Sequence, residues 1–308
     1  MKNPNPDILL YIAIADAYAA AAEYVRGPGA DQAIRDCLAF KGYVGHPTHD
    51  GIVPGRYTDD AEMSIANAKV LLMPGRPTAL SFANAYVDEF IFGGRRVGYA
   101  GRFHDFLLGA TDGADFLRRI QSRSDKNGAA MRSAVLGVLP SVAEVLDIAS
   151  LQARITHDTP EGIFSSQAVA LMSHYALYED GPLRNIGAYC LAHLPPEYAH
   201  RFGYVFSHRW TRGSVRSYDD ASVAITTVHA VADLVMHQSS LMGMLAQTIR
   251  WGGDTDSVAA IAWGIASARY RDERLPVFMT TSLEPGSPRT GVPYLCGIGT
   301  VLMHRYAS

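Results

Sequence analysis

The segment YTDDAEMSIANAKVLL, residues 57–72, joins two adjacent aspartates to a run of apolar residues. Its apolar residues recur three and four positions apart, which predicts an α-helix beginning near Asp59. Thr58, Asp59 and Asp60 would then stand at the first turn of that helix. Hydroxyl and carboxylate side chains are ordinary caps at this position, because they satisfy the free backbone amides and complement the helix dipole.

A second segment, WGGDTDSVAAIAWGI at residues 251–265, repeats this arrangement almost two hundred residues later. Asp254, Asp256 and Ser257 again precede or open an apolar helix, which is expected to run to about residue 270. Two hypotheses follow. The segments are two independent helix caps, or they are two halves of one site.

The helical period continues through most of the chain. Gly and Pro separate these segments, and strict two-residue alternation is almost absent, so strands are not expected. The pattern predicts an all-α fold, with residues 1–308 forming a single compact multi-helix domain. The segments with this period are residues 60–73, 79–92, 141–155, 160–178, 220–236 and 239–251.

Composition excludes several classes of protein. The chain has 308 residues, 48% of them apolar, and a net charge of −3, which gives no general attraction to nucleic acid or to an anionic membrane. Its three cysteines form no CxxC pair, and an odd, scattered set argues against a disulfide framework. A reducing, cytoplasmic location is therefore expected.

The segment at residues 7–25, DILLYIAIADAYAAAAEYV, imitates a signal peptide but carries an aspartate inside its apolar stretch. It is also too short and too acidic to span a membrane, so we predict a buried helix. Asp16 and Glu23 lie seven residues apart and would share one face of an ideal helix. That face is either a solvated stripe or a pair of functional acids.

The two acidic segments have the composition of a metal site. Each supplies two carboxylates and at least one hydroxyl within four residues. These are hard oxygen ligands, suited to Mg²⁺, Mn²⁺ or Ca²⁺ rather than zinc. Four clustered aspartates would raise one another's pKa unless cations lay between them. Adjacent Asp59 and Asp60 point about 100° apart on a helix, so they can address two ions. Paired ions can position and activate an oxygen nucleophile.

Other metal and nucleotide motifs fail in detail. DTDSV fits the nucleophile motif of haloacid-dehalogenase-like phosphatases, but that motif follows a strand, and here it opens a helix. The same residues lack the glycine and glutamate of a calcium-binding loop. The sequence contains no HExxH, G-x-S-x-G or Walker motif.

Taken together, the motifs resemble the ADP-ribosylglycohydrolase family. IADAYAAAAEYV (14–25) is similar to the family's N-terminal G-D-A-L-G-x-x-x-E helix, the segment at 57–72 to T-D-D-T-x-M, and GGDTDSVAAIAWGIASA to G-G-D-T-D-T-x-A-A. Three shorter segments match in the same order: VGYAGRF (97–103), NGAAMRSAVLGVL (127–139) and RITHDTPE (154–161).

The resemblance implies an all-α domain with a cleft that holds two Mg²⁺ ions, for which Mn²⁺ can substitute. The matching metal-ligand positions are Thr58, Asp59, Asp60, Asp254, Asp256 and Ser257, and the catalytic acids would be Glu23, Asp60 and Asp256. The implied substrate positions are Gly98, Tyr99 and Gly101 beside a ribose, the backbone of Asn127, Gly128, Ala129, Ala130 and Met131 around the pyrophosphate, and His157 at a ribose hydroxyl or phosphate. A helix-capping role for His157 stays open.

The implied activity is hydrolysis of the N- or O-glycosidic bond between ADP-ribose and a modified acceptor, with protein arginine as the first expectation. The partner would be an ADP-ribosylated protein or a small ADP-ribose conjugate. The chain departs from the family pattern at ADAYA, at Ala61, at Ser257 and in MRSAV, which lacks a proline. A crystallin-like structural member, an ADP-ribose-binding member and a metal-dependent phosphatase or nucleotide hydrolase remain alternatives.

Overall fold

The computed structural model describes residues 1–285, 287 and 289–307. In this part of the chain the secondary structure is helical and contains no β-strand, which confirms the predicted all-α class. Isolated bridges, such as the one between Val215 and Gly253, are the only extended pairings described.

The elements follow one another as α1 (Ile8–Ala19), η1 (Ala20–Ala22), α2 (Ala30–Leu38), α3 (Asp59–Leu72), α4 (Ala79–Phe92), α5 (Gly101–Leu108), α6 (Gly113–Arg119), α7 (Gly128–Met131), η2 (Ala134–Val138), α8 (Val142–Thr156), α9 (Pro160–Tyr178), η3 (Leu183–Asn185), α10 (Ile186–His193), α11 (Pro196–Phe202), η4 (Gly203–Phe206), α12 (Val223–His237), α13 (Leu241–Trp251), α14 (Thr255–Ala266), α15 (Phe278–Thr281) and α16 (Val292–Tyr306).

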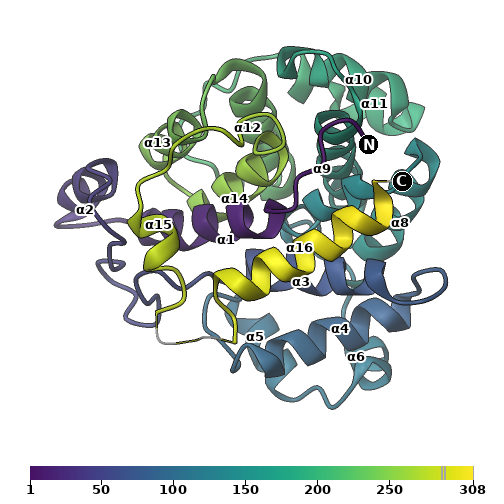
Figure 1. Cartoon of the computed structure of the whole chain (residues 1–308), viewed down its shortest axis with the longest axis horizontal. Coiled ribbons are helices and arrows are strands. Elements are labelled where there is room, and N and C mark those ends of the chain that lie inside the picture. Colours follow the sequence, from purple (N-terminus) through teal and green to yellow (C-terminus); the bar gives the residue numbers. More distant parts are fainter. Residues whose placement is uncertain (286, 288, 308) are drawn as a thin grey trace.

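Helix α1 forms the centre of the molecule, and α14 packs along it (Figure 1). Every residue of α1 is buried, as expected for a helix that is apolar on all sides. The two helices approach closely because α14 has a glycine at the contact. A Cβ atom on Gly264 would lie 2.8 Å from Cγ1 of Ile12.

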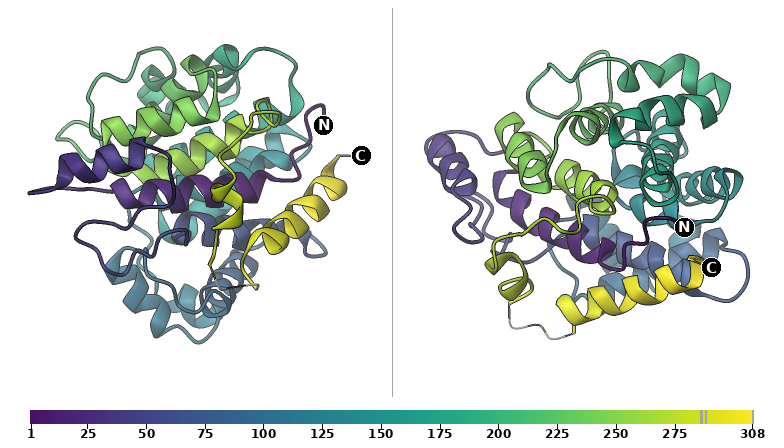
Figure 2. Two further views of the ribbon diagram at one scale, coloured as in Figure 1. Left: turned by 60° about the vertical axis from the view of Figure 1, so that its left-hand side comes forward. Right: turned by 45° about the horizontal axis from the view of Figure 1, so that its top comes forward.

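Helices α3 and α16 pack on the other side of α1 from α14, and α4 covers the outer face of α3 (Figure 1). Two further views show α16 running across the end of α1 (Figure 2). This arrangement brings the N-terminal ends of α3 and α14, which are far apart in the sequence, to the same part of α1.

Most helix predictions are confirmed to within a few residues. Two boundaries were wrong. The segment at 7–25 does not form one helix, because α1 ends at Ala19 and a 3₁₀ turn follows before Glu23 takes an extended conformation. Helix α14 ends at Ala266, before the expected residue 270.

The polar segment at residues 207–220 contains no helix and is not wholly a surface loop. Trp210 and Val215 are buried, and the backbone of Val215 pairs with the glycines before α14. Within the described residues, no helix combines the length and the apolar character that crossing a membrane requires.

Candidate functional site

The N-terminus of α3 is capped by a side chain from another helix. Asp16, fully buried on α1, accepts hydrogen bonds from the backbone amides of Thr58 (2.9 Å) and Ala61 (3.0 Å) and from the Thr58 hydroxyl (2.8 Å). Thr58 itself occupies the N-cap position without a side-chain bond to its own helix. The Thr58 hydroxyl is therefore oriented by α1 rather than used as a local cap.

Backbone contacts hold the N-terminus of α14. The amide of Asp254 donates to the carbonyl of Val215 (2.8 Å), and the amide of Val215 donates to the carbonyl of Gly252 (2.9 Å). Gly253 has φ +86°, and a Cβ atom there would lie 2.1 Å from the Val215 carbonyl oxygen. Both the left-handed backbone and the close approach require glycine at this position.

Two further hydrogen bonds tie α14 to the end of the first helical segment. The Thr255 hydroxyl donates to the carbonyl of Ala19 (2.8 Å), and the amide of Tyr24 donates to the carbonyl of Gly253 (2.8 Å). Asp254 stands at the N-cap of α14, but its side chain makes no capping bond to the helix.

These contacts bring the two acidic segments together. One carboxylate oxygen each from Asp16, Asp60 and Asp256 lies within 4.8 Å of the others, and all three residues are buried. Asp59 and Asp254 flank this group and keep part of their surface accessible to solvent. Since neither Thr58 nor Asp254 caps its own helix, the structure favours two halves of one site over two separate caps.

Burial and mutual repulsion raise the pKa of the clustered acids. Burial is the largest cause in every case. The pKa of Asp16 rises to about 6, although its three hydrogen bonds oppose the shift. Burial and the neighbouring carboxylates raise the pKa of Asp59, Asp60 and Asp256 well above the ordinary value, and burial raises the pKa of Asp254.

The donor set fits a hard divalent cation. Oδ1 of Asp60 is buried and has no hydrogen-bond partner among the described residues. A buried carboxylate oxygen without a partner is costly unless a cation satisfies it. Oxygen atoms from carboxylates and hydroxyls are the ligands that Mg²⁺ and Mn²⁺ prefer.

The sequence predicted that Glu23 lies on the same helix face as Asp16. In the structure, Glu23 instead approaches the cluster from the turn that follows η1. It follows η1 in an extended conformation and is half-buried. His46 Nε2 donates to the Glu23 carbonyl (2.7 Å), and His46 Nδ1 accepts from the amide of Thr48. Burial, with Asp254 and Asp16 as the next causes, raises the pKa of Glu23 to about 8.

Asn127 connects the segment at 127–131 to the acidic cluster. Its side-chain amide donates to Oδ2 of Asp254 (3.2 Å) and to the Thr227 hydroxyl (3.2 Å). Gly128–Met131 form the short helix α7, and the side chains of its last three residues are buried. Only the backbone of α7 is therefore suited to face a ligand.

His157 lies at the C-cap of α8, and its ring contacts Gly128. A Cβ atom on Gly128 would lie 2.8 Å from Cε1 and 3.0 Å from Nε2 of His157. Burial, with Arg132 as a second cause, lowers the pKa of His157 to about 3, so the ring is neutral near pH 7. The structure thus brings together two predicted substrate positions that are 29 residues apart in the sequence.

The loop at residues 97–101 packs against the start of α3. Gly98 has φ +122°, and a Cβ atom there would lie 2.7 Å from Cβ of Thr58. The Tyr99 hydroxyl donates to Oε1 of Glu62 (2.7 Å), so it is engaged within the protein. Gly101 is the first residue of α5.

A buried ion network behind this loop was missed from the sequence. Arg96 binds Glu62 (2.5 Å) and Glu284 (2.8 Å), and its guanidinium also donates to the carbonyl of Tyr57 (2.8 Å). All three charged side chains are almost fully buried. The available signal was Glu62, a charged residue beside the apolar positions that follow the aspartate pair of α3.

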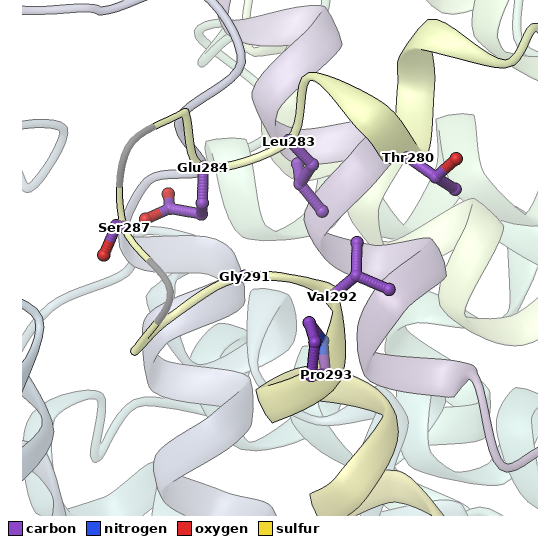
Figure 3. Close-up of a pocket in the computed structure, with 7 residues that line it drawn as sticks. All are labelled: Thr280, Leu283, Glu284, Ser287, Gly291, Val292 and Pro293. Carbon is purple, nitrogen blue, oxygen red and sulfur yellow. The ribbon is translucent and has the colours of Figure 1, made fainter.

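One hollow is lined by none of the five clustered aspartates. It measures about 400 Å³ and is lined by residues between α15 and the start of α16, including Glu284 and Val292 (Figure 3). None of the predicted site residues lines it. A smaller cavity of about 60 Å³ includes Thr58, Arg96 and Val97 in its lining.

Comparison with known proteins agrees with this geometry. The sequence profile described as ADP-ribosylglycohydrolase matches residues 8–297, which include every acid of the cluster. The chain belongs to the ADP-ribosylglycohydrolase family. It is 26% identical over 274 residues to the ADP-ribosyl-[dinitrogen reductase] glycohydrolase of Rhodospirillum rubrum, covering 87% of this chain and 85% of the relative.

The fold of this ADP-ribosylglycohydrolase family member is also found among solved structures. A chain from an ADP-ribosylglycohydrolase-related protein complex superposes with a TM-score of 0.69 and 21% sequence identity. The match covers 98% of this chain and 97% of the other. Family membership supports glycohydrolase activity toward ADP-ribosyl groups in general terms.

Proposed function

We propose that this ADP-ribosylglycohydrolase family member is a Mg²⁺-dependent hydrolase that removes ADP-ribose from modified protein arginine. The observation that carries the proposal is the meeting of the Asp16, Asp60 and Asp256 carboxylates within 4.8 Å. A site built only for stability has no use for several buried acids that raise one another's pKa. Divalent cations would compensate the charge of these carboxylates and keep them ionised.

The residues that would hold two Mg²⁺ ions are Thr58, Asp59, Asp60, Asp254, Asp256 and Ser257, with Mn²⁺ as a substitute. When bound, such ions supply Lewis-acid stabilisation of nearby oxygen atoms. Asp16 would act indirectly in this set, because its hydrogen bonds fix the Thr58 hydroxyl and the first amides of α3.

The carboxylates of Glu23, Asp60 and Asp256 would orient the attacking water and accept its proton. In the reaction, the water oxygen bonds to the anomeric carbon of the ribose and the glycosidic bond to the acceptor breaks. The acceptor nitrogen leaves with a proton, and ADP-ribose is released. The positive charge that develops on the ribose in the transition state would be stabilised by the surrounding carboxylates.

The remaining ADP-ribose contacts would be made by residues outside the acidic cluster. The backbone of Gly128–Met131 would bind the pyrophosphate, and His157 would bind a neighbouring oxygen. Gly98 and Gly101 would lie beside the ribose at the scissile bond. The side chain of Asn127 supports a pyrophosphate position near the cluster, because it donates a hydrogen bond to Asp254.

The test is ADP-ribose release from arginine-linked and serine-linked ADP-ribosylated proteins, measured with Mg²⁺ and with EDTA. Asp256→Asn removes one carboxylate and is expected to lower the rate at least ~100-fold. Asp147→Asn is the matched control, since Asp147 lies exposed on α8 in a surface ion pair with Arg76. The control should retain the wild-type rate.

The outcomes separate the alternatives. Mg²⁺-dependent release that is lost in Asp256→Asn supports the proposal, and the preferred linkage identifies the acceptor. Tight ADP-ribose binding without release would favour a binding protein. Release of AMP or phosphate instead of ADP-ribose would show a phosphatase or nucleotide hydrolase. Neither binding nor release would leave a structural role.

A further inference from the structure

Arg132 is a buried cation that the proposed reaction does not use. It is 1% exposed, and within the described part of the chain no carboxylate forms an ion pair with it. Its guanidinium stacks over the ring of Tyr86, at 4.6 Å from the ring centre. The side chain donates to Oε1 of Gln152 (2.5 Å), to the Gln152 carbonyl (3.3 Å) and to the Thr156 hydroxyl (2.7 Å).

The contact with Thr156 fixes the direction of a hydrogen-bond relay. A guanidinium can only donate, so the Thr156 oxygen must accept from Arg132. The Thr156 hydroxyl is 2.7 Å from Nδ1 of His157, which is the acceptor that it reaches among the described residues. The Gln152 carbonyl, one turn earlier and a common alternative for a helical threonine, already accepts from Arg132.

This relay selects one tautomer of the histidine. If Thr156 donates to Nδ1, the single proton of the neutral ring must sit on Nε2. The opposite tautomer would place a proton on Nδ1 and leave the buried Thr156 hydroxyl without an acceptor, which is costly. A doubly protonated ring would also face the positive charge of Arg132.

The Nε2 edge of the ring lies at α7. Gly128 carries no side chain there, and a Cβ atom on it would lie 3.0 Å from Nε2. The ring edge and the backbone of Gly128 therefore adjoin the same space. A donor at this position suits an oxygen atom that accepts hydrogen bonds, such as a phosphate oxygen or a ribose hydroxyl.

We propose that Arg132 and Thr156 are positioning residues that hold His157 as a neutral Nε2–H donor to an oxygen of ADP-ribose bound beside Gly128. This inference rests on the proposed function, because it needs ADP-ribose at this place. The part that concerns the tautomer can be measured in the protein without ligand. The tautomer of His157 and its hydrogen bond to ADP-ribose can therefore be disproved independently.

The first measurement is ¹⁵N NMR of the Mg²⁺-loaded protein labelled at its 11 histidines. His157→Asn identifies the signals of His157 by removing them. The wild type should show a protonated Nε2 and an unprotonated Nδ1. Thr156→Val removes the hydroxyl and should allow the Nδ1–H form, as should Arg132→Met, which frees the Thr156 oxygen to accept. Thr156→Ser restores the hydroxyl and should restore the wild-type tautomer.

The second measurement is calorimetry of ADP-ribose and ADP binding to the same proteins. Thr156→Val should weaken ADP-ribose binding about 10-fold, the size of one hydrogen bond, whereas Thr156→Ser should stay within about twofold of the wild type. An equal loss for ADP would place the accepting oxygen on the diphosphate or the adenosine ribose, the parts that ADP shares with ADP-ribose. A loss confined to ADP-ribose would place it on the terminal ribose. Thermal unfolding of each variant checks that it is folded.

Two results would overturn the inference. One is an Nδ1–H tautomer in the wild type, or an Nε2–H tautomer that survives in both Thr156→Val and Arg132→Met. The other is unchanged ADP-ribose affinity in Thr156→Val despite a changed tautomer. Failure of the wild type to bind ADP-ribose would remove the donor role together with the proposed function, while the NMR spectra would still decide the relay.

Discussion

The N-termini of α3 and α14 carry similar acids, but the protein holds them in different ways. At α3, a single carboxylate, that of Asp16, accepts three hydrogen bonds. At α14, the support is spread over backbone groups of Val215, Gly252 and Gly253 and over the backbone of Ala19 and Tyr24 on either side of η1. The α3 half of the site therefore depends on one charged side chain, and the α14 half on a conformation that glycine permits.

This difference predicts unequal responses to substitution. Removing one side chain should damage α3 strongly, because two buried amides and a hydroxyl lose their acceptor together. Damage to α14 should require a change in backbone shape. Asp16 belongs both to the cap of α3 and to the carboxylate cluster. Its variants therefore test the stability of the fold and the metal site together, whereas changes at α14 test the backbone that positions Asp254.

The largest effect is expected for Asp16→Ala. It should lower the free energy of unfolding by about 3 kcal/mol, because buried donors at the start of α3 are left without a partner. Urea unfolding in EDTA measures this. Asp16→Asn is the control: its amide oxygen can still accept from Thr58 and Ala61, so it should lose less than half as much. A free energy of unfolding of Asp16→Ala within about 1 kcal/mol of the wild type would show that Asp16 is not an important cap of α3.

The next largest effect is the pH dependence of the metal-free protein. The native pKa values of Asp16, about 6, and Glu23, about 8, lie above the ordinary values of 3.8 and 4.5. These two acids bind more protons in the folded than in the unfolded chain between about pH 4 and pH 8, and the raised pKa values of Asp59, Asp60 and Asp256 act in the same direction, so ionisation of the cluster lowers stability as pH rises. Buried His157, with its pKa lowered to about 3, opposes this fall only below about pH 6.5. In EDTA we expect the Tm to drop by about 5–10 °C between pH 5 and pH 8.

Mg²⁺ should reverse this drop at pH 8 and have less effect at pH 5, where the acids of the cluster hold their protons and bind cations weakly. Differential scanning calorimetry with Mg²⁺ or EDTA at both pH values is the measurement. A Tm that rises with pH in EDTA would show that these carboxylates are not destabilising when ionised.

A smaller effect is expected for Gly253→Ala at the α14 half. The new Cβ would meet the Val215 carbonyl and displace Asp254, which should cost about 2 kcal/mol and weaken Mg²⁺ binding. Gly213→Ala is a matched control, since Gly213 has a similar φ of +72° but no atom within 4 Å of its Cβ position. Equal losses in the two variants, measured by urea unfolding, would show that backbone strain alone matters.

The smallest effects come from two threonines that donate at the two helix starts. Thr58→Val removes a hydrogen bond to a carboxylate and should cost about 1.5 kcal/mol, whereas Thr255→Val removes one to a neutral carbonyl and should cost about 1 kcal/mol. Mg²⁺ titration by calorimetry should show weaker binding only in Thr58→Val. Equal Mg²⁺ affinity in both variants would exclude Thr58 as a ligand.

The sequence predicted the helices better than their ends. Periodicity located α3, α4, α8 and α9 because each has many residues and a clear apolar pattern. It failed after Ala19, where an alanine-rich stretch favours helix locally but the tertiary contacts of Glu23 and Tyr24 stop it. The tilt of one helix against another and the contacts of its last turn are not encoded in a local pattern.

The acidic pairs themselves were readable, because aspartates and hydroxyl residues at helix starts are visible as a motif. Their partners were not. From the sequence, Asp16 fitted a solvated surface residue as well as a functional acid. Its place in the cap depends on where α1 lies against α3. Arg96 stood in a loop of glycines and arginines, where nothing marks it as the buried partner of Glu62 and Glu284.

The sequence by itself determined that this chain is helical, that its two acidic motifs begin helices, and that the order of its motifs is that of a glycohydrolase family. The tertiary structure alone decided that the two motifs form one cluster around Asp16 and that Arg132 and Thr156 reach His157. The physical reason is the range of the forces. Periodicity and capping act within a few residues, whereas repulsion between carboxylates and buried hydrogen bonds depends on distances across helices that only packing sets.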